Sequence, residues 1–485
     1  MTTELETRTT ERTRRDFLRD AVFGLHAVAA ADLLLRDGKL QASDAPGRPG
    51  LHHPAKAKQV IHVFLGGGLS HVDSFDYKPD LEKFHGKDVP ESIGTADVFN
   101  GKVGRLHKSH FAFKKRGRSG LWVSDLFPEI AGIADELTVI KSMVAETANH
   151  IPGIFQANTG FRQMGFPSMG AWLSYGLGTE NENLPSFVVL PDARGIPNAA
   201  GGTFNWTSGF LPARHQGVAF NTRGGAPILD LQPAGGSSPE VQHARLELLN
   251  ELDAIHLEEQ AQTDPLTARI RSYELAARMQ SAIPEAADFS GEPDHIKKLY
   301  GLDRKECSDT ARNCLTARRL IERGVRMVQL WTGDGVSWDA HDDITGTGYK
   351  SHTGEALRVD RPIAGLIRDL KNRGLLDSTL VMITTEFGRT PFAQADKGKL
   401  NRGSDHHPQG FTNILVGAGL KKGFAHGATD DVGYASVVNP VTTYDLHATL
   451  LHLLGIDHER LTYYHDGIQR RLTNVHGKVA RAILS

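Results

Sequence analysis

Carboxylate and imidazole side chains gather in one loop of the C-terminal third of the chain. The apolar run Leu380 to Ile383 predicts a buried strand, and Glu386 follows it in a segment punctuated by glycine and proline. The same segment holds Asp405-His406-His407, just before a second strand-like run from Asn413 to Val416. Such groups bind divalent metals, so we interpret this loop as half of a metal site.

A second polar group follows the apolar run Val325 to Trp331. Asp339, His341, Asp342 and Asp343 lie within five residues of one another. Ionised carboxylates this close repel each other, and a divalent cation would remove the repulsion. A solvated acidic loop is the alternative interpretation. We interpret Asp339 and His341 as the other half of the metal site.

A glycine-rich turn supplies a third group of candidate ligands. The run Gln59 to Leu65 predicts a first strand, which continues directly into Gly66-Gly67-Gly68. Glycine lets the backbone pass close to a ligand, and His71, Asp73 and Asp76 come next. The alternative is a polar loop in which an aspartate caps the next helix.

Strand and helix patterns alternate along the chain and predict an α/β fold. Further strands are expected at 137–142 and 187–190, and helices at 305–323 and 360–373, with His352 and Glu355 in the loop before the second helix. In such folds ligand sites lie beyond the ends of the strands, where the polar groups described above fall.

Composition restricts the class of partner. The 485 residues carry a formal net charge of -2, with 39% hydrophobic and 23% charged residues. This balance has no polyanion-binding signature, so nucleic acid is not expected as a partner. Cys307 and Cys314 lie about 10 Å apart at helical rise, which is too far for a mutual disulfide.

The N-terminal segment, residues 1–45, resembles a twin-arginine export signal and the start of a linker. Arg14-Arg15 and Phe17-Leu18 precede a weakly apolar run from Ala21 to Leu35. An amphipathic helix with a basic flank is the alternative. The resemblance implies the twin-arginine export machinery as a partner, and an exported, periplasmic or extracellular protein. We expect a linker at 46–57 and, because no run of about 20 apolar residues occurs, no transmembrane span in the mature protein.

Six ordered motifs together resemble the domain-of-unknown-function family 1501 (DUF1501). They are the export signal, the GGGLSHVDSFD loop, the NHIPG segment followed by Thr159-Gly160, the WDAH segment, EFGRTP and DHHP. That family consists largely of exported bacterial proteins, and it is similar to the alkaline phosphatase and sulfatase superfamily. The resemblance implies a three-layer α/β sandwich around a mostly parallel central sheet over residues 58–485. It also implies that a loop and helical insertion interrupts this domain at about 191–300.

The resemblance also assigns roles to individual residues. Gly66-Gly67-Gly68 stands where the superfamily has a metal-binding aspartate between glycines, so Asp73 or His71 would have to substitute. The nucleophile position falls on His150, beside Asn149, where no hydroxyl is present. Glu386 keeps the carboxylate of an Asp-His pair whose imidazole is lost.

The resemblance further implies one metal site rather than two. His406 matches the last histidine ligand, and Asp339 matches the aspartate of another ligand segment, with His341 as its partner. These three would hold zinc, manganese or iron. Three further carboxylates would complete a second site or orient the ligands, namely Glu386, Asp405 and Asp73.

The expected function is metal-dependent hydrolysis of a sulfate or phosphate ester of a small molecule or a glycan. His150 would act as nucleophile or general acid, or water activated by the metal would attack, and Arg389 would neutralise charge on the oxyanion. The alternative is an exported binding module whose active site has been lost. An enzyme requires His150 and His406 to face a shared site, whereas a binding module does not.

Overall fold

The computed structural model describes most of the chain between residue 50 and the C-terminus. The described residues are 50–90, 99, 103–181, 183–194, 201–222, 241, 244, 247, 248, 251, 283, 285–333, 335–396 and 398–485. The expected export signal and most of the helical part of the expected insertion lie outside them. Within the described residues, no helix is both long enough and apolar enough to cross a membrane.

The fold is built on one nine-stranded sheet. In spatial order it runs β12 (Phe424–His426), β4 (Leu137–Val144), β11 (Phe411–Gly417), β8 (Thr379–Thr384), β1 (Gln59–Leu65), β7 (Met327–Thr332), β5 (Phe187–Leu190) and β6 (Val218–Ala219), with β15 (Val441–Thr442) beside β4. Only β11 among these described strands runs antiparallel to its neighbours. The prediction of a mostly parallel central sheet is confirmed.

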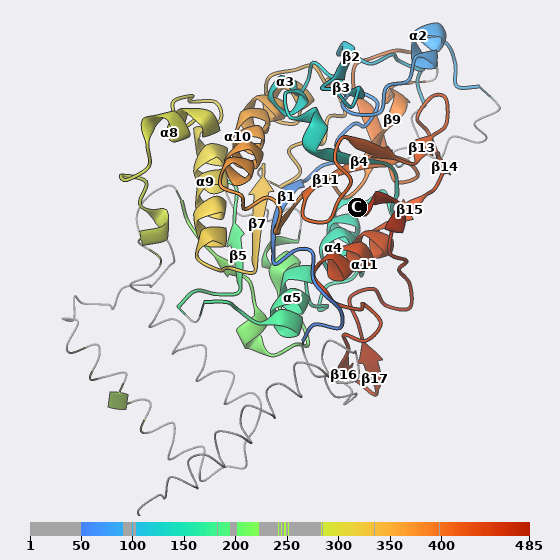
Figure 1. Ribbon diagram of the computed structural model, residues 1–485. Coiled ribbons are helices and arrows are strands. Elements are labelled where there is room, and N and C mark those ends of the chain that lie inside the picture. Colours follow the sequence, from blue (N-terminus) through green and yellow to red (C-terminus); the bar gives the residue numbers. More distant parts are fainter. Residues whose placement is uncertain are drawn as a thin grey trace, which may run out of the picture.

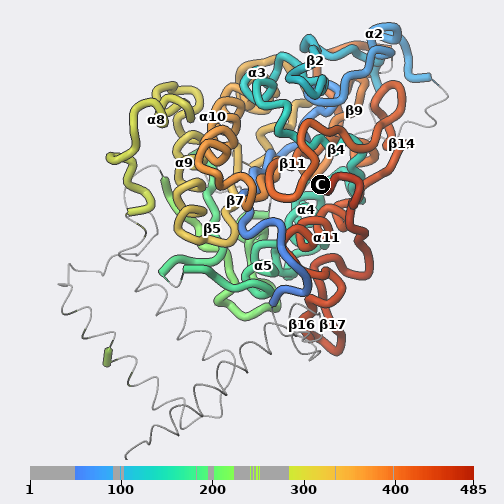
Figure 2. Tube along the Cα trace, in the orientation of Figure 1, coloured from blue at the N-terminus to red at the C-terminus, as the bar shows by residue number. Residues whose placement is uncertain are grey.

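The first strand occupies the centre of this sheet. β1 pairs in parallel with β7 on one side and β8 on the other, and all of its residues are buried. Figure 2 shows this early segment, in blue, passing through the interior of the trace with later segments on both sides of it. A strand covered on both faces has a nearly continuous apolar sequence, interrupted here by Gln59 and His62, and this explains why it could be predicted from the sequence.

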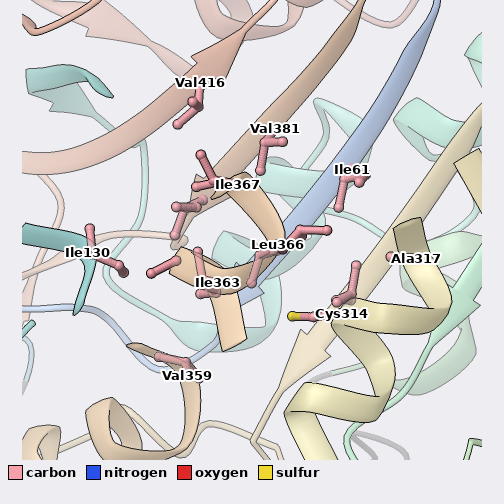
Figure 3. Close-up of a cluster of buried hydrophobic side chains, with 14 of the residues drawn as sticks. Ile61, Ile130, Cys314, Ala317, Val359, Ile363, Leu366, Ile367, Val381 and Val416 are labelled. Atoms are coloured by element: carbon pink, nitrogen blue, oxygen red, sulfur yellow. The ribbon is translucent and has the colours of Figure 1, made fainter. Parts of the chain in front are cut away.

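Two layers of helices cover the two faces of the sheet (Figure 1). On one face α9 (Ser308–Glu322) and α10 (His352–Asn372) pack on alternate residues of the central strands, among them Ile61 and Val381 (Figure 3). The other face is covered by α4 (His150–Thr159), α5 (Met169–Leu177) and α11 (Thr443–Leu453), which contact the intervening residues such as Val60 and Met382. The expected three-layer sandwich is therefore confirmed.

Shorter elements decorate this sandwich. They are α2 (Asp80–Phe84), β2 (Phe113–Arg116), β3 (Leu121–Ser124), α3 (Pro128–Ala131), α8 (Asp294–Tyr300), β13 (Ala428–Thr429), β14 (Ser436–Val438), β16 (Tyr463–His465) and β17 (Ile468–Arg470). Residues 52–57, part of the segment expected to be a linker, donate four backbone hydrogen bonds to Leu453 and Gly455 at the end of α11.

Two local predictions are wrong. α10 begins at His352 rather than 360, because Ser351 caps it by accepting a hydrogen bond from Gly354 N. The polar loop after β8 contains a two-stranded antiparallel ribbon, β9 (Gly388–Ala393) with β10 (Ser404–His407). A short ribbon with polar residues lacks the apolar alternation by which strands are recognised.

The strand order decides where the polar loops meet. Since β1, β7 and β8 are adjacent and parallel, the segments that follow them leave the sheet at the same edge. These segments begin at residues 66, 333 and 385, and each carries one of the polar groups identified in the sequence. Parallel strands thus bring groups far apart in sequence to one place: Gly67 N, after β1, lies 2.9 Å from Glu386 Oε1, after β8, although 319 residues separate them.

Candidate metal centre

Three imidazoles converge on one carboxylate oxygen. Oδ1 of Asp339 lies 2.7 Å from His341 Nε2, 2.9 Å from His406 Nε2 and 3.3 Å from His150 Nε2. The Nε2 atoms of His341 and His406 are 3.0 Å apart. The His150 and His406 rings meet edge to face, with centroids 4.2 Å apart. Residues from three separate segments of the chain therefore face a single point.

The other ring nitrogen of each histidine is engaged by an oxygen atom. His406 Nδ1 donates to the carbonyl oxygen of Ala148 at 2.7 Å, and His150 Nδ1 donates to Glu386 Oε1 at 2.7 Å. His341 Nδ1 donates to Gln394 Oε1. In a neutral imidazole with its proton on Nδ1, Nε2 carries a lone pair. When the three rings are neutral, all three lone pairs therefore point at Asp339.

This donor set fits a divalent cation. Lone pairs and a carboxylate that face one another across about 3 Å repel unless a proton or a cation lies between them. Three nitrogens and one oxygen are ligands of zinc, manganese and iron, and histidines fixed through Nδ1 are typical of such sites. Among the described residues two possible ligand groups occur, His150–Asp339–His406 and His341–Asp405–His406. Because His406 belongs to both groups, the arrangement favours a single ion.

The electrostatics of the cluster also call for positive charge. Burial raises the pKa of Asp339, but the adjacent imidazoles of the three histidines and the charge of Arg389 outweigh it and hold the pKa of this carboxyl well below its ordinary value. Burial lowers the pKa of His406 to about 4, so that ring is neutral. Burial also lowers the pKa of His150, but contacts with Asp339 and Glu386 exceed it and raise the pKa overall.

Glu386 is held in place by the backbone of the turn that follows the neighbouring strand β1. Its two carboxylate oxygens accept hydrogen bonds from Gly67 N at 2.9 and 3.1 Å, and Oε2 also accepts from Thr385 Oγ1 at 3.1 Å. Gly67 has a φ of 122°, and a side chain there would come within 2.6 Å of Asp339 N. The glycine turn after β1 thus lets the loops that carry Glu386 and Asp339 pack directly together.

Two cations approach Asp339 from different environments. Arg389 is fully buried, and it donates from one terminal nitrogen to Asp339 Oδ1 at 2.9 Å and from the other to the carbonyl of Ser404. Lys350 donates to Asp339 Oδ2 at 3.0 Å, and its side chain is 42% exposed. Lys350 therefore offers an accessible positive charge, whereas the guanidinium of Arg389 is already engaged inside the protein.

The other predicted site residues lie around the cluster. Asn149 is exposed and caps α4, accepting from Ile151 N at 3.3 Å. Asp405 accepts from His406 N at 2.8 Å, and its Oδ1 lies 4.0 Å from His341 Nδ1. Asp73 is in neither ligand group, because it accepts instead from Ser70, Ser109 and His110.

Several neighbours of the site carry no recognisable sequence signal. The carbonyl of Ala148, the side chain of Gln394 and Lys350 all contact cluster residues. The rings of Phe99 and Phe387 also lie 5.0 and 4.9 Å from the ring of His406. A backbone carbonyl has no residue preference, and single polar residues in loops form no pattern. Only the three-dimensional arrangement identifies them.

Comparison with known proteins yields one family. The model of a protein of unknown function, DUF1501, matches residues 57–484. No curated protein matches the chain.

Several solved structures are similar to the chain at low identity. Ps i-CgsB in complex with k-i-k-neocarrahexaose has 12% identity and a TM-score of 0.36, over 82% of this chain and 72% of that one. A protein in the alkaline phosphatase superfamily from Vibrio parahaemolyticus has 12% identity and a TM-score of 0.36, over 84% and 70%. Alkaline phosphatase from the Antarctic bacterium TAB5 has 10% identity and a TM-score of 0.33, over 82% and 98%. At these values the likeness carries no argument about activity.

Proposed function

Because the chain belongs to the DUF1501 family, whose description assigns no activity, its chemistry must be inferred from the site, and we propose that it is a metal-dependent hydrolase of sulfate or phosphate esters. The observation that carries this proposal is the convergence of three Nε2 lone pairs on Asp339 Oδ1. A metal that is only structural does not require accessible charge beside it, whereas Lys350 provides such a charge here.

In this proposal Asp339, His150, His341 and His406 hold one divalent ion. A bound ion of this kind acts as a Lewis acid on an ester oxygen and lowers the pKa of water to about 7. This makes His150 a metal ligand and not a nucleophile. Its Nδ1 is hydrogen-bonded to Glu386, and its Nε2 faces Asp339, as the Nε2 atoms of His341 and His406 also do. Glu386 orients His150, and Gln394 orients His341.

Lys350 is the residue that we expect to bind the anionic part of the ester. It reaches Asp339 from a partly exposed position, and a cation bound by Asp339 would free the ammonium group for another oxygen. Arg389 takes the supporting role of fixing Asp339, since both of its terminal nitrogens already donate inside the protein. This differs from the role of neutralising charge on an oxyanion that we expect for Arg389 from the sequence.

Export is part of the proposal but rests on the sequence alone. The paired arginines and the weakly apolar run in residues 1–45 support passage through the twin-arginine machinery to a periplasmic or extracellular location. That route carries folded proteins, which suits a protein that acquires its metal before export. Blocking export by replacing Arg14 and Arg15 with lysine should keep the protein in the cytoplasm, as cell fractionation would show.

The first test is elemental analysis of the purified full-length chain. We expect about one transition-metal ion per chain, lost in Asp339→Ala and in His406→Ala because each removes a ligand from a four-ligand set. His465→Ala, at a partly exposed position, and Asp377→Ala, at an exposed one, both outside the site, are the matched controls and should retain the ion.

Hydrolysis of 4-nitrophenyl sulfate and 4-nitrophenyl phosphate by the metal-loaded protein is the second test. Absence of metal in the wild-type chain after refilling with zinc, manganese and iron would contradict the metal site. Retention of the ion without hydrolysis of any ester would favour the alternative, a binding module.

A further inference from the structure

The segment that enters the fold, residues 50–57, lies across the C-terminal end of α11, and we call it the N-terminal strap. The backbone N–H groups of His52 and His53 donate to the carbonyl oxygen of Gly455 at 2.8 and 3.1 Å. Two further N–H groups of the strap donate to the carbonyl oxygen of Leu453, both at 2.8 Å. A carbonyl in the last turn of a helix has no partner within that helix. The strap therefore completes the hydrogen bonding at the end of α11.

Close packing at Gly455 brings the strap directly onto the turn after α11. This glycine has a φ of 78°, and a side chain there would come within 2.6 Å of the carbonyl oxygen of His53 and 2.8 Å of the Leu51 side chain. The absence of a side chain lets the two backbones meet. Because the contact is made over only a few residues, a change of charge at His52 or beside His53 acts on the whole of it.

His52 holds the strap through a hydrogen bond that only a neutral ring can make. Its Nδ1 accepts from the backbone N–H of Asp457, in the loop after α11, at 2.9 Å. A protonated imidazole carries a hydrogen on both nitrogens and cannot accept. Burial lowers the pKa of His52, Arg460 and His53 lower it further, and the charge of Asp457 opposes them. Acid therefore removes this contact.

A pair of imidazole rings makes a second contact of the same kind. The ring of His53 lies against that of His452 in the last turn of α11, with centroids 4.5 Å apart. Two protonated rings at this separation repel each other. Burial lowers the pKa of His452, His53 and Arg481 lower it further, and Asp457 opposes them. His52 and both stacked rings are partly exposed, so they exchange protons with solvent while the protein stays folded.

We propose that the N-terminal strap is a pH-sensitive device, docked on α11 while His52 and His452 are neutral and released when they take up protons. Protons bind the released state more tightly, so docking is complete above about pH 6.5 and weakens as the pH falls below that value. Release moves the first tie between the chain and the fold from the strap to Lys58, whose N–H donates to Ser378 at 2.8 Å. The strap shares no residue with the metal centre, so the inference is independent of the proposed function.

Hydrogen–deuterium exchange of the full-length chain at pH 7.5 and 5.0 tests the release. Protection is corrected for the intrinsic exchange rate of each amide, and the β2–β3 hairpin is the reference because residues 113–124 contain no histidine. We expect protection of the strap amides to fall about tenfold or more in acid, since one pKa unit corresponds to a factor of ten. Protection of the reference hairpin should change by less than about threefold, and β1 should stay more protected than the strap.

The double variant His52→Asn with His452→Phe tests the cause of the release. The amide oxygen of asparagine can accept from Asp457 N without taking up a proton, and phenylalanine keeps a ring against His53 without a charge of its own. We expect wild-type protection of the strap at pH 7.5 and a change of less than about threefold at pH 5.0. His465→Asn, at a partly exposed position on β16, is the control and should lose strap protection in acid as wild type does.

The wild-type measurement decides whether the strap is released, and the variants decide why. Unchanged strap protection in wild type, or equal falls in the strap and the reference hairpin, would overturn the release. A fall in the double variant as large as in wild type would overturn the role of the two histidines. If the double variant is already unprotected at pH 7.5, His52→Asn alone decides in the same way, because asparagine replaces only the acceptor.

Discussion

At the scale of single residues, the geometry of the cluster depends on the hydrogen bonds that orient each side chain from outside the cluster. Asp339 receives three imidazoles in front, and Arg389 donates to the same oxygen from inside the protein. The direction of each imidazole is fixed by the oxygen that accepts from its Nδ1. Ligand preorganisation therefore resides largely in residues that never touch the proposed ion.

Replacing Arg389 by lysine should show how much this support contributes. Lysine has no second terminal nitrogen to donate to Ser404 while it contacts Asp339, so a buried carbonyl or carboxylate loses its partner. We expect the free energy of unfolding of the metal-free protein to fall by about 3 kcal/mol in urea titrations. Arg105→Lys, at an exposed ion pair of 3.7 Å, should change it by no more than about 0.5 kcal/mol. Equal effects in the two variants would contradict the supporting role.

The residues of the cluster could be predicted from the sequence more readily than the residues that contact and orient them. Asp339, His341 and His406 could be identified because ligand-type residues follow strand patterns at fixed spacings. Asp73 was grouped with them by its closeness to the glycine turn, but Ser70 and Ser109 direct its carboxylate elsewhere. Gln394 and Lys350 could not be predicted, because an isolated polar residue in a loop carries no spacing that indicates its partner.

At the scale of secondary-structure elements, the site is made by three adjacent parallel strands and the turns after them. The strands were predictable, since β1 and β5 have the bounds expected from their apolar runs, whereas the β9–β10 ribbon was not. The turn after β1 has a geometric requirement of its own. Gly67 donates to Glu386 while its Cα faces the backbone of Trp338 and Asp339.

Gly67→Ala should move the loop after β7 away from the turn after β1. A methyl group at this position would lie 2.6 Å from Asp339 N and 2.7 Å from Trp338 N, so the loop after β7 would have to move. We expect the variant to lose the metal in elemental analysis. Gly120→Ala is the matched control, because Gly120 also has a positive φ of 70° but no atom within 4 Å of the added methyl group. It should cost about 1 kcal/mol of stability through backbone strain alone and keep the metal. Metal retention in Gly67→Ala would show that the close packing of these loops is not required.

At the scale of the whole molecule, a buried polar chain links the sheet to α4. His62 on β1 donates from Nε2 to Thr384 on β8 at 2.7 Å and accepts at Nδ1 from Gln329 on β7 at 3.2 Å. Gln329 in turn donates to Asn158 on α4 at 2.6 Å. Burial lowers the pKa of His62 to about 3, with a further contribution from His447. The folded protein therefore keeps this histidine neutral.

This burial predicts a loss of stability in acid. The pKa of His62 in the folded protein lies below the unfolded value of about 6.5. The contribution of His62 to the stability of the folded protein is therefore complete above about pH 6.5. It decreases by about 1.4 kcal/mol per pH unit as the pH falls from about 6.5 toward 3. Between pH 7.5 and 5.0 the free energy of unfolding, measured in urea, should decrease in wild type by about 2 kcal/mol more than it does in His62→Asn. His465→Asn, at a partly exposed position, should keep the wild-type pH dependence. The same slope in all three proteins would show that His62 is not kept neutral.

The central position of β1 also has a consequence for synthesis. The partners of His62 on the neighbouring strands follow it by 267 and 322 residues. At ribosomal rates of roughly 5–20 residues per second, β1 waits on the order of ten to sixty seconds before either neighbour has been translated. During that time a strand that is buried along its whole length in the folded protein has both edges open, and open strand edges are prone to pair with other chains. The nascent chain should therefore need a holding chaperone until β8 emerges from the ribosome.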